Sequence, residues 1–105
     1  MATLVLRTET LAGPPVAAFE VVNLPEAMTA RELIRLRARE EFSRTHPDAL
    51  QHDHESQADK AERAFLANGF FLLVGDRQVL ELDEVVRLDV TAEVVFLRLV
   101  PLVGG

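Results

Sequence analysis

An almost continuous apolar run near the end of the chain constrains its fold more than any other feature. Residues 94–103 read Val-Val-Phe-Leu-Arg-Leu-Val-Pro-Leu-Val, with Arg98 as the only charged side chain. A short run of this kind is typical of a strand that is covered on both faces or flanked by neighbouring strands. We therefore expect residues 94–100 to form a central strand, and the rest of the chain must supply its partners.

The N-terminal segment predicts a β-hairpin. Residues 2–9 alternate, so that Leu4 and Leu6 would face a core while the side chains between them face outward. Gly and Pro mark a turn over residues 10–15, and residues 16–22 are typical of the returning strand. The first strand can pair in parallel with the C-terminal strand, provided that a crossover connection lies between them.

A helix signal after the hairpin provides that crossover. Thr29 and Glu32 fit a capping box, in which Thr accepts a hydrogen bond from the first turn and Glu reaches back to the cap. The helix should run over residues 30–44, because Pro47 limits its continuation. The apolar stripe that we expect to pack on the sheet comprises Ala30, Leu33, Ile34, Ala38 and Phe42.

The middle of the chain is polar before it becomes apolar again. Residues 46–59 are rich in His, Asp, Gln and Glu without an apolar period, which predicts a loop. A second helix is expected over residues 57–67, followed by a stop signal at Asn68 and Gly69. The remaining apolar segments predict a strand over residues 70–74, a brief strand over residues 78–80 and a connection over residues 82–89.

In this order the elements predict an α+β fold of the β-grasp type. A mixed sheet of about four or five strands would fold over one main helix, with an extra helical insert at about residues 45–68. Residues 1–100 would form a single domain, as expected for a chain of 105 residues. Residues 101–105 would form a flexible tail that ends in Gly104 and Gly105.

Composition excludes several classes of protein. The chain has no cysteine, which excludes disulfides and cysteine-bound zinc, and its net charge of −6 argues against binding to nucleic acid. No apolar run approaches the ~20 residues of a membrane span, and the first residues do not resemble a secretory signal. We therefore expect a soluble, cytoplasmic protein without nucleic-acid or membrane partners.

Several segments resemble ubiquitin and its relatives. Residues 2–8 are similar to the first strand of ubiquitin, and residues 71–78 (Phe-Leu-Leu-Val-Gly-Asp-Arg-Gln) are similar to the third strand of the family and its Gly turn. The triplet Leu97-Arg98-Leu99 before a Gly-Gly end resembles the ubiquitin C-terminus. Residues 93–96 and 101–105 are similar to the ending of the molybdopterin-synthase small subunit and of the thiamin sulfur carriers. Such a mixture is consistent with a bacterial ubiquitin-like protein.

The resemblance implies that the glycine end is an acyl donor. In this superfamily an activating enzyme adenylates the terminal carboxylate with ATP and magnesium, and sulfur then attacks the adenylate. In modifiers the resulting enzyme thioester passes to a target amine, and conjugating enzymes and deconjugating peptidases take part. In sulfur carriers the product is a C-terminal thiocarboxylate for cofactor biosynthesis. Both alternatives place the expected conjugation and adenylation site at Gly105 and Gly104, with catalysis in the partner and no cofactor bound by the chain itself.

Partner binding is expected around the same end. Arg98 would pair bidentately with a carboxylate of the activating enzyme, or it is an ordinary surface arginine. Leu72 and Phe96 would form an exposed apolar patch if Leu73 and Leu97 face the helix; the alternative is burial under the inserted segment. The full set of expected partner-binding residues is Arg98, Leu72, Phe96, Leu102 and Val103.

Other clusters give weaker signals. A metal could bind the histidines of residues 46–55, but a solvated loop is favoured and we expect no metal site. Arg31, Arg35 and Arg39 recur at helical spacing, which fits either a docking face for an acidic partner or, preferably, a solvated face. No catalytic constellation is present, so we expect no enzyme activity. The only lysine is Lys60, so a chain that is joined to lysines offers few acceptors of its own.

Overall fold

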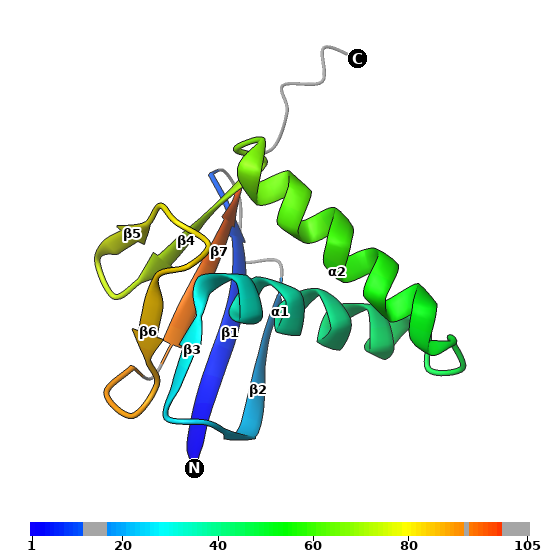
Figure 1. Ribbon diagram of the computed structural model, residues 1–105, viewed down its shortest axis with the longest axis horizontal. Coiled ribbons are helices and arrows are strands. Elements are labelled where there is room, and N and C mark those ends of the chain that lie inside the picture. The colour runs from blue at the N-terminus through cyan, green and yellow to red at the C-terminus, as the bar shows by residue number, and fades with distance from the viewer. Residues whose placement is uncertain (12–16, 92, 100–105) are drawn as a thin grey trace.

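The computed structural model describes residues 1–11, 17–91 and 93–99 (Figure 1). Its fold is α+β, with a mixed five-stranded sheet in the order β2-β1-β7-β4-β5, a separate pair formed by β3 and β6, and two helices. In this part of the chain neither helix is long and apolar enough to cross a membrane. The elements are β1 (Ala2–Thr10), β2 (Ala17–Leu24), β3 (Ala27–Thr29), α1 (Ala30–Thr45), α2 (Gln51–Leu66), β4 (Phe70–Val74), β5 (Arg77–Val79), β6 (Val85–Arg87) and β7 (Glu93–Arg98).

The predicted central strand is confirmed. β7 lies between β1 and β4, parallel to β1 and antiparallel to β4. β1 and β2 form the predicted antiparallel hairpin. Because β1 and β7 run in parallel, the chain must cross over between them, and α1 crosses one face of the sheet (Figure 1). The predicted order of hairpin, helix and central strand is therefore correct.

The core lies between the sheet and α1. Phe96 of β7 is opposite Thr8 of β1 and Leu72 of β4, so these three side chains share a face. Burial of large apolar side chains is the main favourable term in folding, at about 1.5–3 kcal/mol for each one. The largest fully buried side chains are Phe96, Leu4, Leu6, Leu33, Ile34, Leu72, Val79, Val86, Val94 and Thr8.

The capping box predicted for α1 is confirmed. Glu32 N–H donates to Thr29 Oγ1 at 3.2 Å, and Thr29 N–H donates to Glu32 Oε1 at 2.9 Å. Ala30 N–H donates to the carbonyl of Glu84 at 2.8 Å, just before β6. These bonds satisfy backbone donors that have no partner inside the helix. α1 ends at Thr45, one residue beyond its predicted end.

The second helix is longer than predicted. α2 begins at Gln51, so the loop prediction for residues 46–59 is wrong over most of its length. Only Ala58 and Phe65 are buried on this helix, which explains why apolar periodicity does not reveal its first turns. Ion pairs with α1 stabilise those turns instead.

The connection predicted over residues 82–89 also contains a strand. β6 pairs antiparallel with β3, and this two-stranded sheet is absent from the sequence-based prediction. Val86 of β6 is fully buried in the core, so the segment packs beneath the start of α1. A strand of this length has too few residues to show an alternation of its own.

Candidate functional site

The end of β7 is hydrogen-bonded to the segment that follows α2. Leu99 N–H donates to the carbonyl of Gly69 at 3.3 Å, one residue after β7 ends. Gly69 N–H in turn donates to Ala64 O at 2.7 Å, and a Cβ at Gly69 would lie only 3.2 Å from that oxygen. A residue without a side chain therefore suits this junction. Leu102, Val103, Gly104 and Gly105, to which the sequence assigns partner binding and conjugation, lie outside the described residues.

Arg98 is the last residue of β7 and is exposed. It lies opposite Thr10 of β1 and Phe70 of β4, so its side chain is on the α1 side of the sheet, at the edge of the core. No carboxylate contacts it among residues 1–11, 17–91 and 93–99.

A second arginine lies close to Arg98 in the same region. The Arg37 side chain is only 11% exposed, and its Nη2 donates to Thr8 Oγ1 at 3.0 Å and pairs with Glu41 at 2.7 Å. The guanidinium carbon lies 5.4 Å from the centre of the Phe96 ring. Burial lowers the pKa of Arg37; Glu41 opposes this shift, and the positive charge of Arg98 adds to it.

Arg37, Arg98 and the backbone of Leu99 form a positively charged corner, which we call the strand-exit site. Arginine stays protonated at neutral pH even with a lowered pKa, but Glu41 pairs with Arg37, so the exposed positive charge of the corner is that of Arg98. Sequence reasoning identifies Arg98 but misses Arg37. The signal that could have found it is the spacing of Arg37 and Glu41, four residues apart on α1, although that spacing does not say which way the pair faces.

The prediction of an exposed patch at Leu72 and Phe96 is wrong. Both side chains are fully buried. They lie opposite each other on the same face of the sheet, where the Phe96 ring lies beneath Arg37 of α1. The error concerns which face of each strand is covered, because both alternating sets of residues in β4 and β7 are apolar. Periodicity alone cannot choose between two faces of equal hydrophobicity.

The opposite face of the sheet carries the apolar residues that are partly accessible. In the register of β4 and β7, Phe71 is opposite Leu97 and Leu73 is opposite Val95, and all four are of intermediate exposure. Both helices lie on the other face of the sheet (Figure 1). We call these four residues the open sheet face. Beside it, Arg7 of β1 pairs with Glu93 of β7 at 2.8 Å.

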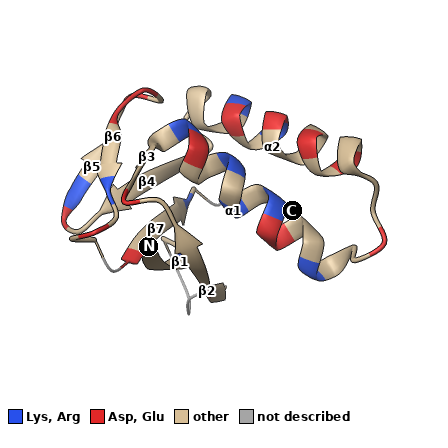
Figure 2. Ribbon diagram, turned by 60° about the horizontal axis from the view of Figure 1, so that its bottom comes forward, with Lys and Arg blue, Asp and Glu red and all other residues tan. Residues whose placement is uncertain are grey.

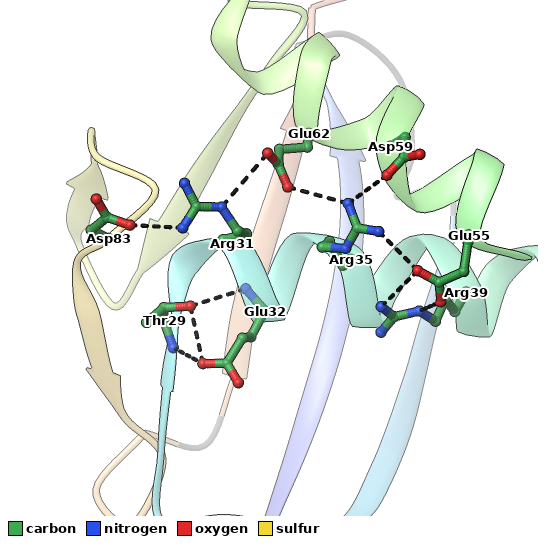
Figure 3. A network of polar contacts seen from close by, with 9 residues as sticks. All are labelled: Thr29, Arg31, Glu32, Arg35, Arg39, Glu55, Asp59, Glu62 and Asp83. Carbon is green, nitrogen blue, oxygen red and sulfur yellow. Dashed lines mark hydrogen bonds and ion pairs between the residues drawn. The ribbon is translucent and has the colours of Figure 1, made fainter.

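The arginine row on α1 forms an ion-paired seam with α2, and the side chains of Arg31 and Arg39 stay partly exposed to solvent, as expected for a solvated face. Acidic residues recur along α2 and basic residues along α1 (Figure 2). The side chains of the two helices reach toward one another across the seam (Figure 3). The ion pairs are Arg31 with Glu62 and Asp83, Arg35 with Glu55, Asp59 and Glu62, and Arg39 with Glu55, at 2.7–3.6 Å.

These contacts shift the pKa values of the charged side chains in the seam. Hydrogen bonds from Arg39 and then Arg35 lower the pKa of Glu55. A hydrogen bond to Asp59 raises the pKa of Arg35, and one to Asp83 raises that of Arg31. The acidic partner considered for these arginines is thus, to a large extent, the second helix of the same chain.

The histidines contact an aromatic ring rather than one another. The ring of His46 stacks on Phe42 with centroids 4.4 Å apart, and His54 meets the same ring edge-on at 5.2 Å. His52 lies 3.3 Å from Asp53. In the part of the chain that the structure describes, no group of three His, Asp or Glu side chains is placed to hold a metal ion.

Comparison of the chain with protein-family models, with curated proteins and with solved structures found no match. The function is therefore inferred from the residues. The strand-exit site offers the exposed Arg98 to an acidic partner, while Arg37 is largely buried and paired with Glu41, and the open sheet face offers an apolar surface. Both features suit recognition by another protein.

Proposed function

We propose that this chain is a ubiquitin-like modifier with a β-grasp fold. Its Gly105 carboxylate is adenylated by an activating enzyme that uses ATP and magnesium, the acyl group passes to an enzyme cysteine as a thioester, and a target amine then takes it as an amide. The chain is the acyl donor, and the catalytic groups belong to its partners. The proposal requires Gly105 to be the last residue of the mature protein.

The position of β7 is the observation that carries this proposal. A β-grasp sheet has its last strand at the centre, parallel to the first strand, with a helix across one face, and the order β2-β1-β7-β4-β5 with α1 fits that description. β7 is hydrogen-bonded between β1 and β4 up to Arg98, so the sheet gives the end of this strand a rigid base. A rigid base suits a tail that must enter a narrow enzyme channel, where glycine offers the least hindered acyl group.

The described residues also suggest how the activating enzyme is recognised. Arg98 is exposed at the end of β7 and presents a planar fork of donors that matches a carboxylate. The open sheet face provides an apolar surface for the same enzyme or for a later partner. Leu102 and Val103 would contact the walls of the channel that admits the glycines.

Trypsin provides a specific test in cells of the source organism. Cleavage after Arg98 leaves residues 99–105 attached to any lysine to which the chain has been conjugated, and this branch identifies the donor. We expect such branched peptides from cells that express the wild-type chain, and none from cells that express a variant without Gly105. A further variant with residues added after Gly105 is the matched control, because it keeps both glycines but blocks the carboxylate.

Absence of branched peptides in wild-type cells would contradict the modifier proposal. If the extended variant also kept every function of the wild-type chain, the protein would instead be an interaction domain whose glycines have no chemical role.

A sulfur carrier is the second candidate, and the proline before the glycines favours it. Pro101-Leu102-Val103-Gly104-Gly105 is similar to the ending of the sulfur carriers. In that case sulfur replaces one oxygen of the Gly105 carboxylate, and the chain supplies it to cofactor biosynthesis. The intact mass of the chain would then increase by one oxygen-to-sulfur exchange, whereas amide adducts on other proteins would rule the carrier out.

A further inference from the structure

Lys60 is the only side-chain amine in this protein. It lies on α2 and is exposed, and no carboxylate pairs with it in the described part of the chain. Acyl transfer from Gly105 to a side-chain amine of its own chain must therefore use Lys60.

Lys60 lies in a groove that leads toward the strand-exit site. The groove runs between α1 and α2, and Lys60 shares it with Arg37, Glu41 and Gln57. Arg37 also contacts Phe96 of β7 and is close enough to Arg98 to be affected by its charge. The lysine and the end of β7 are thus on the same side of the molecule.

The tail is long enough to reach Lys60. Leu99 N–H is hydrogen-bonded to Gly69, nine residues after Lys60. Lys60 lies six residues before Leu66, where α2 ends, which is about 9 Å at about 1.5 Å per helical residue, and the three residues from there to Gly69 add at most about 10 Å. The six residues from 100 to 105 span up to about 20 Å when extended, at about 3.3 Å each. The contour length therefore exceeds the separation, and the lysine side chain adds further reach.

We propose that Lys60 accepts the activated acyl group of its own Gly105 and closes an intramolecular isopeptide bond. This inference rests on the proposed function, which supplies the activated acyl group. The Lys60 amine, after losing a proton to solvent, forms an N–C bond to the Gly105 carbonyl, and the C–S bond of the thioester breaks. The enzyme thiol leaves and regains its proton, so the cyclised chain differs from the linear chain by the loss of one water. ATP cleavage to AMP and pyrophosphate, at the activation step, drives the sequence.

Proximity favours this reaction over attack by other molecules. A reactive group on a short flexible linker reaches its target at an effective concentration of about 1 mM. In a solution that contains about 10 μM protein, cyclisation would therefore exceed transfer to Lys60 of another copy by about 100-fold. The product has no free Gly105 carboxylate, so it cannot be conjugated. Lys60 would thereby remove from circulation those modifiers that do not find a target.

A Gly105 thioester prepared by intein cleavage tests the reach without any enzyme. We expect this thioester of the wild-type chain to convert at pH 8 into the cyclised monomer, which has lost the thiol and is lighter than the linear chain by one water. The kinetics should be first-order and independent of protein concentration. Lys60→Arg should prevent the conversion and leave the fold unchanged, because the side chain is exposed and the charge is kept. Tryptic peptides should place residues 99–105 as a branch on Lys60.

The matched control moves the only lysine out of reach. Arg87 lies on β6, far from the end of β7 (Figure 1). In the double variant Lys60→Arg and Arg87→Lys, we expect no cyclised monomer and only slow, concentration-dependent dimers. A wild-type thioester that gives dimers alone, or that cyclises as fast when Lys60 is replaced, would overturn the inference.

Intact mass in cells separates this inference from the proposed function. A monomer lighter by one water, absent from the Lys60→Arg variant, supports cyclisation. If residues 99–105 are found on target lysines but the lighter monomer is absent, the modifier proposal stands and the cyclisation is refuted. If neither is found in cells, both are refuted.

Discussion

Replacing Leu72 or its neighbour Leu73 by alanine should have very different consequences for stability. The two residues are adjacent in β4, but Leu72 is fully buried on the same face as Phe96, and Leu73 belongs to the open sheet face. Their sizes and intrinsic strand preferences are the same, so each serves as the control for the other. A comparison of the two variants therefore tests which face of the sheet is covered.

The magnitudes follow from burial. Leu72 lies opposite Val79 on one side and Phe96 on the other, both fully buried, so alanine leaves a cavity in addition to the lost transfer free energy. Such replacements destabilise by about 2–5 kcal/mol, and about 3 kcal/mol is expected here. At Leu73 solvent fills the vacated space, so only part of the transfer term is lost, about 1 kcal/mol. The difference is about 2 kcal/mol in the free energy of unfolding.

Urea denaturation followed by circular dichroism measures this difference. A loss of 3 kcal/mol lowers the urea midpoint by at least about 1 M, and the melting temperatures of the two variants should differ by about 8–16 °C. Equal destabilisation by Leu72→Ala and Leu73→Ala would refute the assignment of the faces, because it would mean that Leu73 is also covered. In cells, Leu73→Ala should reduce the yield of conjugates although the protein stays folded.

Three further predictions concern the cap, the seam and the strand-exit site. Thr29→Ala should destabilise the protein by about 0.5–2 kcal/mol because it removes one side of the capping box; an unchanged urea midpoint would contradict this. Arginines lower the pKa of Glu55, so its stabilisation is complete above the ordinary Glu pKa of about 4.3 and is lost as the pH falls through the lowered folded-state value. Glu55→Gln should therefore be less stable than wild type at pH 7, and the urea midpoints of the two proteins should converge below about pH 4. A difference between the two midpoints that does not change with pH argues against the ion pairs. Arg98→Lys keeps the charge and the tryptic site but loses the planar fork, so conjugates that carry residues 99–105 should fall about tenfold while the melting temperature stays the same; undiminished conjugation would show that Arg98 has no bidentate partner.

Local patterns were enough to predict the elements that are defined by nearby residues. The hairpin, the capped α1 and the central β7 depend on alternation, on a cap within one helical turn and on a short apolar run, and all three are confirmed. The first turns of α2 are defined by ion pairs between Glu55 and arginines that are 16 and 20 residues away. No local pattern contains that information, and those turns were predicted as a loop.

The sequence by itself determined the chemical inventory of this protein: one lysine, no cysteine, and a terminal Gly-Gly after an apolar run. It also determined that β7 must be central, because so apolar a strand needs neighbours on both sides. Only the tertiary structure decided which face of that strand is buried. β4 and β7 carry apolar side chains on both faces, so the choice depends on where the helices pack. Arg37 of α1 lies over the Phe96 ring, and Leu72 is opposite Phe96 on that buried face. The same packing places Arg37 beside Arg98 and Leu99 against Gly69, because contacts between distant residues form only when the chain folds.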